Sequence, residues 1–386
     1  MRIGIDMHTV TDFMQGTRTY TFNIIENLLK IDRENTYYLY INKGDNKIRD
    51  YFRQENVFFR HITPQQRVMR ILVGLPIQLA ADSIDVFHCQ YMGPFLAKTP
   101  YVVMLHDIIH EYMPEYFPKT LNRLMRISYP VSAKRAGRIL TVSEHSKNDI
   151  VKYYKIPEDK IIVTYDAVSD DFRPVMEKDK VEDVLKKYGI RGEYILYVGR
   201  LEPRKNLIRL LQAFNELMTN HNIRQKLVIV GMKYFQYEKL FELVQVLGLQ
   251  DKVIFTGRVE DQDLPSVYNG ATVFVYPSIA EGFGIPPLEA MACGVPVISS
   301  NTSSLPEVIG DAGILVDPFN VHDLAAEIHK VLSDKDLQKS MKMRGIIQAK
   351  KFSWETSARK TLMVCRELYE ETIKRKTRNK KPFQFS

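Results

Sequence analysis

The chain has 386 residues, of which 45% are hydrophobic and 26% are charged. This is the composition of an ordinary globular protein, and the chain is long enough for two hydrophobic cores of typical size. Its longest apolar runs, such as residues 71–80, stop near ten residues, which excludes a bilayer-spanning helix of roughly 20 residues. A formal net charge of +8 indicates an anionic partner without identifying it.

Short apolar runs alternate with helical patterns along most of the chain. In the first half the runs lie at 2–7, 84–90, 101–107 and 138–143, with helical spacing at 19–30 and 144–154. The alternation resumes with runs at 193–200, 226–231, 252–258, 272–278, 295–301 and 313–318. Strands made almost entirely of Val, Ile and Leu are buried on both faces, which is typical of parallel sheets with helical crossovers. We therefore expect an α/β fold throughout.

A polar, lysine-rich stretch at residues 176–187 separates the two series of runs. We interpret residues 173–189 as a linker between two doubly wound domains, one formed by residues 1–172 and the other by residues 190–355. Residues 356–386 then form a C-terminal helix and a basic tail. That tail carries six basic residues between Lys374 and Lys381, which indicate either a solvated terminus or a contact with a membrane or polyanion.

The three cysteines, Cys89, Cys293 and Cys365, have neither a pairing pattern nor the spacing of metal ligands. Reduced thiols in the cytosol are therefore expected. The N-terminal sequence MRIGIDMHTV lacks the charged segment and the long apolar stretch of a signal peptide. We expect a cytoplasmic protein that lies at most on the inner face of the cell membrane.

In doubly wound sheets, ligands bind beyond the carboxyl ends of the strands. In YVGRLEPRKN, a predicted strand ends at Gly199 and a predicted helix with one apolar face begins near Asn206. Arg200 and Lys205 lie between them, beside free backbone N–H groups and the positive end of a helix dipole. This combination suits a diphosphate, although a solvated basic loop also explains the motif when it is taken alone.

The stretch AEGFGIPPLEAMACGVPVISSN follows another predicted strand and places two acids around a helix start. Glu281 lies on the loop after the strand, and Glu289 falls in the first turn of the helix that a Pro-Pro pair opens. Carboxylates accept hydrogen bonds from vicinal hydroxyls, so the pair suits a molecule with two sugar rings. Taken singly, Glu289 is also explained as a helix N-terminal acid and Glu281 as a surface loop acid.

GRLEPRKN, followed about eighty residues later by PSIAEGFGIPPLEAMACGVPVISS, resembles the retaining glycosyltransferases of the GT-B class, family 4. GIDMHTVTDFMQGTRTYTFNII, VVMLHD and TVSEHSKNDI are similar to the same family, so the resemblance covers nearly the whole chain. It implies two Rossmann-like domains that face a central cleft, the first binding the acceptor and the second the nucleotide sugar. It also implies a C-terminal helix that crosses back to the first domain. One departure is Ala167, where many relatives have glycine.

The resemblance also implies a role for each matching residue. Arg200 and Lys205 would neutralise the diphosphate as it leaves. His106 would contact the transferred hexose, and Glu281 would hold it; these four residues form the implied catalytic set. The other implied donor contacts are the carboxylate of Glu289 on the ribose, the backbone of Val259 on the base, and backbone groups of Gly16, Phe283, Gly284 and Ile285 on the phosphates and the sugar.

Enzymes of this kind need no nucleophilic side chain, because the acceptor hydroxyl attacks the anomeric carbon from the face that the diphosphate leaves. Catalysis is then chiefly positioning and stabilisation of the leaving charge. The pair Asp261 and Asp263 has the spacing of a metal-binding Asp-x-Asp motif, but it precedes a helical pattern, where Asp is favoured as a cap. We therefore predict no cofactor and no catalytic metal. His88 is interpreted as a satisfied histidine at the edge of the core, and Cys293 as a packing residue.

The expected donor is GDP-mannose or a UDP-hexose, and PPLEAMACGVPV, which resembles many mannosyltransferases, favours GDP-mannose. The expected acceptor is a glycan or a lipid-linked glycan in surface polysaccharide synthesis, and no nucleic acid partner is expected. Two alternatives stay open, a nucleotide-sugar epimerase of the same fold and a non-catalytic nucleotide-sugar-binding protein. A dinucleotide dehydrogenase is disfavoured, because no strand is followed by G-x-G-x-x-G at a helix start.

Basic residues recur in KTLNRLMRISYPVSAKRAGR, where a helix that Pro130 kinks or interrupts would carry a stripe along one side, formed by Lys119, Arg123, Arg126, Lys134 and Arg138. Arg67 and Arg70 flank the apolar residues 71–76 nearby in the sequence. A basic stripe beside exposed apolar residues suits an anionic lipid surface. A solvated helix face on a basic protein is the alternative.

Overall fold

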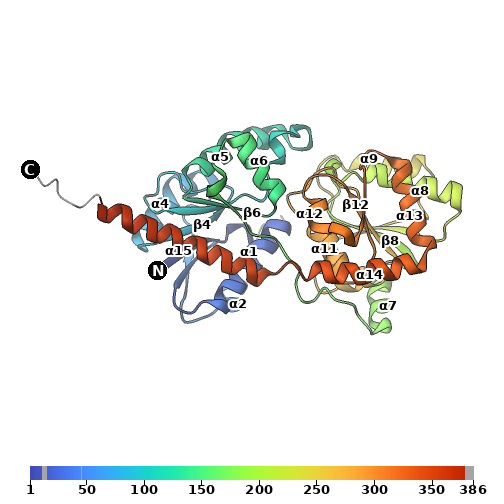
Figure 1. Cartoon of the computed structure of the whole chain (residues 1–386), viewed down its shortest axis with the longest axis horizontal. Coiled ribbons are helices and arrows are strands. Elements are labelled where there is room, and N and C mark those ends of the chain that lie inside the picture. The colour runs from blue at the N-terminus through green and yellow to red at the C-terminus, as the bar shows by residue number, and fades with distance from the viewer. Residues whose placement is uncertain (11–14, 45, 379–386) are drawn as a thin grey trace, which may run out of the picture. The chain divides into compact units, whose positions relative to one another are not determined.

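The computed structural model describes residues 1–10, 15–44 and 46–378 (Figure 1). They form two compact units. The first contains Met1–Glu111, Thr120–Asp166 and the C-terminal segment from Trp354, and the second contains Tyr112–Lys119 and Ala167–Ser353. Within the described ranges, no helix combines the length and the apolar character that passage through a membrane requires.

The first unit is built on a seven-stranded sheet of order β3-β2-β1-β4-β5-β6-β7, and every neighbouring pair is parallel. The strands are β1 (Arg2–Asp6), β2 (Thr36–Ile41), β3 (Val57–His61), β4 (Val86–Gln90), β5 (Tyr101–Met104), β6 (Arg138–Thr141) and β7 (Ile161–Val163). β4 and β5 are buried at every position, because their side chains are mostly apolar on both faces. The predicted parallel sheet is confirmed here.

The helices of the first unit are α1 (Gln15–Ile31), α2 (Asn46–Tyr51), α3 (Arg67–Met69), α4 (Leu75–Ala81), α5 (Lys119–Arg135), α6 (Glu144–Tyr154) and α15 (Trp354–Arg378). A π-helical turn at Arg70–Gly74 joins α3 to α4. α15 lies along α1 (Figure 1). The rings of Trp354 and Tyr20 meet edge to face between these two helices. The C-terminal helix therefore returns to the first unit, as the family resemblance implied.

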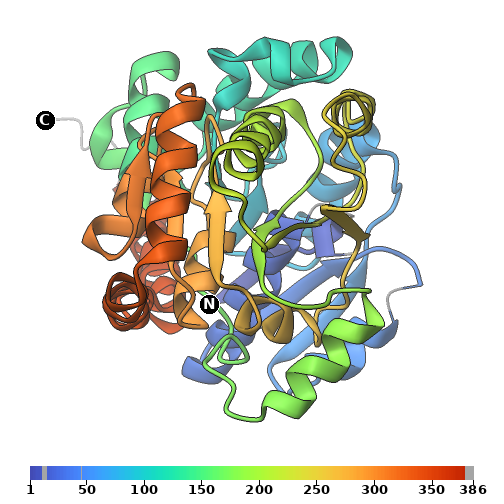
Figure 2. The same cartoon turned by 90° about the vertical axis from the view of Figure 1, so that its right-hand side faces the viewer.

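The second unit has a six-stranded parallel sheet of order β10-β9-β8-β11-β12-β13. Its strands are β8 (Tyr194–Val198), β9 (Lys226–Val230), β10 (Val253–Gly257), β11 (Val273–Tyr276), β12 (Val297–Ser300) and β13 (Ile314–Val316). Helices cover both faces of this sheet (Figure 2): α7 (Lys178–Lys187), α8 (Leu207–His221), α9 (Glu238–Val246), α10 (Leu264–Asn269), α11 (Ile285–Ala292), α12 (Leu305–Ile309), α13 (Val321–Ser333) and α14 (Lys335–Ala349).

The predicted linker at residues 173–189 contains α7, which packs against α10 of the second unit. Lys187 Nζ donates to Asp263 Oδ2 at 2.6 Å, and the Tyr188 hydroxyl donates to the same oxygen at 2.8 Å. Most of the lysine-rich stretch is therefore a helix of the second unit, because Val181 and Leu185 supply it with an apolar face that the sequence interpretation overlooked.

The predicted basic stripe is shorter than expected. α5 runs through Pro130 without interruption but ends at Arg135, so Arg138 lies in β6, where it forms an ion pair with Glu371 of α15. Arg70 is buried, with Nη2 3.9 Å from Asp6 Oδ2, so its guanidinium does not accompany the exposed apolar side chains beside it. Both arginines pair with acids that lie far away in the sequence, and local spacing does not reveal such partners.

Each sheet reverses its strand order once, between β1 and β4 in the first unit and between β8 and β11 in the second. In sheets of this kind, ligands bind beyond the carboxyl ends of the two strands at which the order reverses. In the second unit the loops at these ends are residues 199–206 and 277–284, and in the first unit Asp6 and Gln90 end the two strands. Ligand-binding residues are expected at these two places.

Candidate active site

The loop after β8 is fixed by close backbone contacts. A Cβ at Gly231 would lie 1.8 Å from the carbonyl oxygen of Gly199, so only glycine permits the approach of these two loops. The chain then forms a 3₁₀ turn at Pro203–Lys205. This turn is capped by Asn206, which has a left-handed φ of 60°. Asn206 Nδ2 donates to Pro277 O at 3.0 Å and to Pro318 O at 2.6 Å. Asn206 therefore ties the loop after β8 to the loop after β11.

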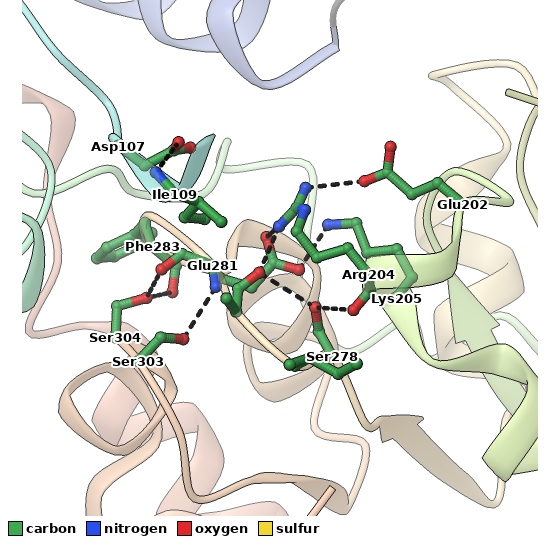
Figure 3. A network of polar contacts seen from close by, with 12 residues as sticks. Asp107, Ile109, Glu202, Arg204, Lys205, Ser278, Glu281, Phe283, Ser303 and Ser304 are labelled. Carbon is green, nitrogen blue, oxygen red and sulfur yellow. Dashed lines mark hydrogen bonds and ion pairs between the residues drawn. The ribbon is translucent and has the colours of Figure 1, made fainter. Parts of the chain in front are cut away.

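This turn directs the Lys205 side chain into the interior of the site (Figure 3). Its Nζ donates to Glu281 Oε1 at 2.5 Å and to Tyr276 Oη at 2.8 Å, while the residue is only 9% exposed. Burial lowers the pKa of Lys205, and the Glu281 carboxylate opposes that shift. For Glu281, burial alone raises the pKa of the carboxyl group, but Lys205 and Arg204 outweigh burial and lower it to about 2. The predicted cation and acid thus form one buried ion pair.

Arg204 is a site residue that the sequence interpretation missed. Its Nη1 donates to Glu281 Oε2 at 3.1 Å and also to the carbonyl oxygen of Ala280 (Figure 3). Its Nη2 donates to Glu202 Oε1 at 2.8 Å. The sequence feature that could have indicated Arg204 is its position next to Lys205. In an extended loop, however, neighbouring side chains point in opposite directions, so the pair would not be expected at one site. The 3₁₀ turn brings both cations to the same carboxylate.

Arg200, the other predicted cation, has a different environment in the same unit. Its guanidinium lies over the ring of Tyr234, with Cζ 4.9 Å from the ring centroid. Stacking of this kind orients the plane of the guanidinium. The predicted contact of Arg200 with a diphosphate stays a prediction.

The loop after β11 is held by two serines that the sequence interpretation also missed. Ser303 Oγ accepts a hydrogen bond from the Glu281 backbone N–H at 2.9 Å, and Ser304 Oγ donates to the carbonyl oxygens of Glu281 and Phe283 at 3.0 and 2.8 Å (Figure 3). Gly284 has a φ of 109°, which favours glycine at the point where α11 begins. The first N–H groups of a helix have no partner within the helix, so Gly284 and Ile285 keep the backbone donors that were predicted for a sugar or phosphate.

Glu289 is the fifth residue of α11 and so lies just beyond the predicted first turn, because the helix begins at Ile285, one residue before the prolines. Its Oε2 accepts a hydrogen bond from the Tyr268 hydroxyl at 2.7 Å. Burial raises the pKa of Glu289 to about 7. The hydrogen bond from Tyr268 lowers this pKa, and the negative charge of Asp261 raises it further. Since Asp261 follows the buried Val259 by two residues, the predicted ribose and base contacts lie in one region of the second unit.

The predicted residues of the first unit lie at the carboxyl edge of its sheet. His106 follows β5, is 8% exposed, and has Nε2 2.8 Å from Gln90 Oε1. Burial, followed by the nearby His88, lowers the pKa of His106 to about 3, so its imidazole is neutral at physiological pH. Gly16 is the second residue of α1, where backbone N–H groups have no partner in the helix.

His88 differs from its interpretation as a satisfied core histidine. Both of its ring nitrogens are buried and have no hydrogen-bond partner among the described residues, and burial lowers its pKa to about 4. Cys293 is buried, as predicted for a packing residue, and the other two cysteines are also buried and free.

The Asp-x-Asp pair weighed as a metal-binding motif contains a carboxylate with other partners. Asp263 occupies the cap position of α10, but its carboxylate binds Lys187 and Tyr188 instead of the helix N–H groups. Among residues 1–10, 15–44 and 46–378, no three or more His, Cys, Asp or Glu side chains are grouped in a way that could hold a metal ion.

Two family models match the chain in succession. The model Glycosyltransferase Family 4 matches residues 14–172, and the model Glycosyl transferases group 1 matches residues 180–348. Among curated proteins, the O-antigen chain mannosyltransferase B of Escherichia coli is 41% identical over 262 residues, which are 68% of each chain. The serotype-specific mannosyltransferase WbdA of the same species is 34% identical over 288 residues, which are 73% of this chain and 34% of WbdA.

Solved structures share the fold at lower sequence identity. A glycosyltransferase from Rickettsia africae superposes with a TM-score of 0.75 at 22% identity, covering 95% of this chain and 98% of the other. The Anabaena protein HepE, solved in complex with UDP-glucose, superposes with a TM-score of 0.72 at 17% identity, covering 97% of this chain and 99% of the other. Both likenesses extend over nearly the whole of each chain.

Proposed function

The chain belongs to the family 4 glycosyltransferases of the GT-B fold, and we propose that it is a retaining, metal-independent hexosyltransferase that uses GDP-mannose in the synthesis of a surface polysaccharide. The observation that carries this proposal is the buried network of Lys205, Arg204 and Glu281 at the carboxyl edge of β8 and β11. It combines fixed positive charge for a leaving diphosphate with a carboxylate for sugar hydroxyls. The preference for mannose rests on the relatives named as mannosyltransferases, one of them for the O-antigen chain.

The chemistry follows from what these groups can do. As the bond from the anomeric carbon to the diphosphate breaks, negative charge grows on the leaving oxygen. Lys205 is buried, Arg204 is partly buried, and both are already held by hydrogen bonds, so they would stabilise that charge without reorganising. Glu281 stays ionised because its pKa is about 2, and would accept hydrogen bonds from the hexose hydroxyls. The acceptor hydroxyl would attack the same face and pass its proton to the departing phosphate.

A panel of nucleotide sugars tests this function. With an α-mannoside acceptor we expect GDP release from GDP-mannose, undiminished in EDTA, because the site supplies its positive charge through lysine and arginine. Conversion of a UDP-sugar to its epimer without diphosphate release would favour the epimerase. Binding without either reaction would favour the non-catalytic protein, and activity that EDTA abolishes would contradict the metal-independent scheme.

The pKa of Glu289 gives a second prediction. If its carboxylate holds the ribose hydroxyls, only the deprotonated form binds well. With a pKa of about 7, the deprotonated fraction rises about tenfold between pH 6 and pH 8, so the Kd for GDP should fall by about tenfold over that interval. Isothermal titration calorimetry at several pH values measures this slope.

Glu289→Gln is the matched control, because it removes the titration and leaves the ionisation of GDP unchanged. This variant should bind GDP with a Kd that changes much less over the same pH interval. At pH 8 it should bind more weakly than the wild type, since a charge-assisted hydrogen bond contributes about 1.5–3 kcal/mol. Equal pH slopes in the two proteins would mean that Glu289 does not contact the nucleotide.

Peripheral contact with an anionic membrane is part of the proposed function, and two neighbouring segments of the first unit support it. Arg67 at the start of α3 hydrogen-bonds Tyr129 of α5. Large apolar side chains are exposed on both segments: Val68, Met69, Val73 and Ile77 on the first, and Leu124, Ile127 and Val131 on the second. Exposed cations accompany them, Arg67, Arg123, Arg126, Lys134 and Arg135. Each cation near an anionic surface contributes about 1 kcal/mol to membrane binding.

The membrane contact is tested by flotation with phosphatidylglycerol vesicles at low and high salt. Ile77 and Ile127 are each 63% exposed, so the double variant Ile77→Asp/Ile127→Asp should fold and yet lose vesicle binding. The control is Met343→Asp/Ile347→Asp on α14, where the side chains are 55% and 63% exposed, and it should bind vesicles as the wild type does. If the wild-type protein does not bind the vesicles at low salt, the proposed membrane contact is wrong and a soluble acceptor is favoured.

A further inference from the structure

We propose that Gln90 is a positioning residue whose side-chain amide fixes the ring orientation and the tautomer of His106. In this arrangement His106 Nε2 carries the proton, and Nδ1 keeps a lone pair that can accept a hydrogen bond from a sugar hydroxyl. The contact with sugar rests on the proposed function, whereas the ring and its tautomer can be tested without substrate.

The backbone of two adjacent strands brings the two side chains together. Gln90 ends β4 and is paired with Met104 at the end of β5, and His106 follows two residues later. The distance from His106 Nε2 to Gln90 Oε1 is 2.8 Å, and both residues are more than nine-tenths buried. Because β4 also borders the point where the strand order reverses, this pair lies at the edge where ligands of such sheets bind.

The amide oxygen selects one tautomer. An amide oxygen can only accept a hydrogen bond, so the imidazole nitrogen facing it must carry a proton. A neutral imidazole has one N–H group, and the other nitrogen is then an acceptor. Burial, with His88 as the second cause, keeps His106 neutral, which makes this single arrangement the one that persists at physiological pH.

The ring is held on its other sides by uncharged groups. Tyr20 of α1 meets it edge to face with ring centroids 4.9 Å apart, and Tyr91 lies against it at 5.4 Å. The His106 carbonyl oxygen accepts a hydrogen bond from Ser146 of α6 at 3.1 Å. Burial raises the pKa of both tyrosines, so they remain protonated.

Other titratable groups nearby do not replace the amide. His88 of β4 is neutral because burial lowers its pKa. Asp166 would act through its negative charge on Tyr20 and Tyr91, and burial raises the pKa of this carboxyl group. Asp107 is the next residue in the chain, and its Oδ1 accepts a hydrogen bond from the Ile109 N–H at 3.2 Å. Gln90 is therefore the group that contacts the Nε2 edge of the imidazole.

The side-chain amide of Gln90 also has an NH2 group. Within the part of the chain that the structure describes, the buried Gln90 Nε2 has no hydrogen-bond acceptor, and neither ring nitrogen of His88 has a hydrogen-bond partner. Buried polar groups in folded proteins nearly always have a partner. The unpaired N–H groups of Gln90 thus mark a place where an oxygen atom of the bound sugar, or a water molecule, would complete the arrangement.

Nitrogen-15 NMR of histidine-labelled protein tests the tautomer, with the His106 signals assigned by their loss in His106→Asn. We expect the wild type to show a neutral His106 protonated at Nε2 at pH 7.5. In Gln90→Glu the carboxylate should keep that tautomer and raise the pKa of His106 by a unit or more. In Gln90→Met no amide oxygen faces Nε2 of His106, so both tautomers of the imidazole should be present. A wild-type His106 protonated at Nδ1 would overturn the proposal, and that result does not depend on either variant folding.

Steady-state kinetics tests the positioning role. Gln90→Met should lower kcat by about 10- to 100-fold with little change in the KM of the donor, and Gln90→Glu should recover part of that loss at high pH. The control is Gln78→Met, which removes a glutamine that donates to the His61 carbonyl at 2.6 Å elsewhere in the same unit. Equal losses in Gln78→Met and Gln90→Met would indicate a purely structural effect and contradict positioning. If no nucleotide sugar is turned over by the wild type, the proposed function fails while the NMR result still decides the role of Gln90.

Discussion

Replacing Lys205 with methionine is expected to lower kcat for hexose transfer by about 10²–10³-fold, the range for loss of one group that stabilises a developing negative charge. Lys205 Nζ is held by Glu281 and by the Tyr276 hydroxyl before any ligand arrives, so its position does not have to be created during the reaction. Binding of GDP should also weaken, by about 1.5–3 kcal/mol for a lost charge-assisted hydrogen bond. Stopped assays of GDP release and calorimetry measure the two effects.

The buried ion pair determines how this experiment must be controlled. Removing one partner of such a pair leaves an uncompensated charge in the interior, which can cost about 3–5 kcal/mol of stability. Here Arg204 remains beside Glu281 and reduces that cost. The double variant Lys205→Met/Glu281→Gln should therefore be more stable than Lys205→Met and equally inactive. Lys339→Met, an exposed lysine of α14, is the control for loss of a cation in the same unit. A kcat within threefold of the wild type in Lys205→Met would refute the assignment of Lys205 to the leaving group.

Replacing Glu281 with glutamine is expected to lower kcat by at least about 10²-fold while the Kd for GDP changes by only a few-fold. The reason is that Glu281 is proposed to hold the transferred hexose, which GDP lacks. Glutamine preserves the shape and removes the negative charge that Lys205 and Arg204 hold in place. If GDP affinity falls sharply and turnover does not, then Glu281 and Glu289 have been given each other's roles.

The same substitution has a stability effect with a defined pH dependence. The pKa of Glu281 is lowered from 4.5 to about 2 in the folded protein, so its ionised form is favoured by folding. This contribution is present above pH 4.5 and is lost as the pH falls toward 2. Its magnitude is roughly 3 kcal/mol, at about 1.4 kcal/mol per pKa unit. Urea unfolding should show Glu281→Gln less stable than the wild type at pH 7, with a smaller difference at pH 3.

The sequence predicts this site well where the chemistry depends on position at a strand end. Lys205 and Glu281 follow two different strands, and the rule that ligands bind beyond the carboxyl edge of a parallel sheet was sufficient to bring them together. Arg204 was missed because its direction depends on the 3₁₀ turn and on the left-handed Asn206, neither of which has a periodic pattern. Ser303 and Ser304 were missed because they lie after β12, and only the folded sheet places that loop beside the loop of Glu281.

The errors in the fold have a similar origin. The stretch 176–187 was interpreted as a linker from its charge, although Val181 and Leu185 form a short apolar face that packs on the second unit. Arg138 was assigned to a helical stripe because the spacing continued, but the strand β6 begins there and Glu371 lies more than two hundred residues away in the chain. His88 was expected to be satisfied, and no pattern in the sequence reveals that both of its ring nitrogens lack a partner. Local periodicity therefore predicts the elements, whereas partners distant in sequence require the structure.

Proton NMR of a mixture of the protein, GDP-mannose and an α-mannoside acceptor follows the donor, the product and the configuration of the new bond in one experiment. With the wild-type protein we expect the anomeric signal of GDP-mannose to disappear, GDP to accumulate in step, and a new α-configured mannoside signal to grow. With Lys205→Met or Glu281→Gln the new signal should not grow. A β-configured product would contradict retention of configuration. An unchanged GDP-mannose signal, with every other donor of the panel also unconsumed, would contradict hexose transfer itself.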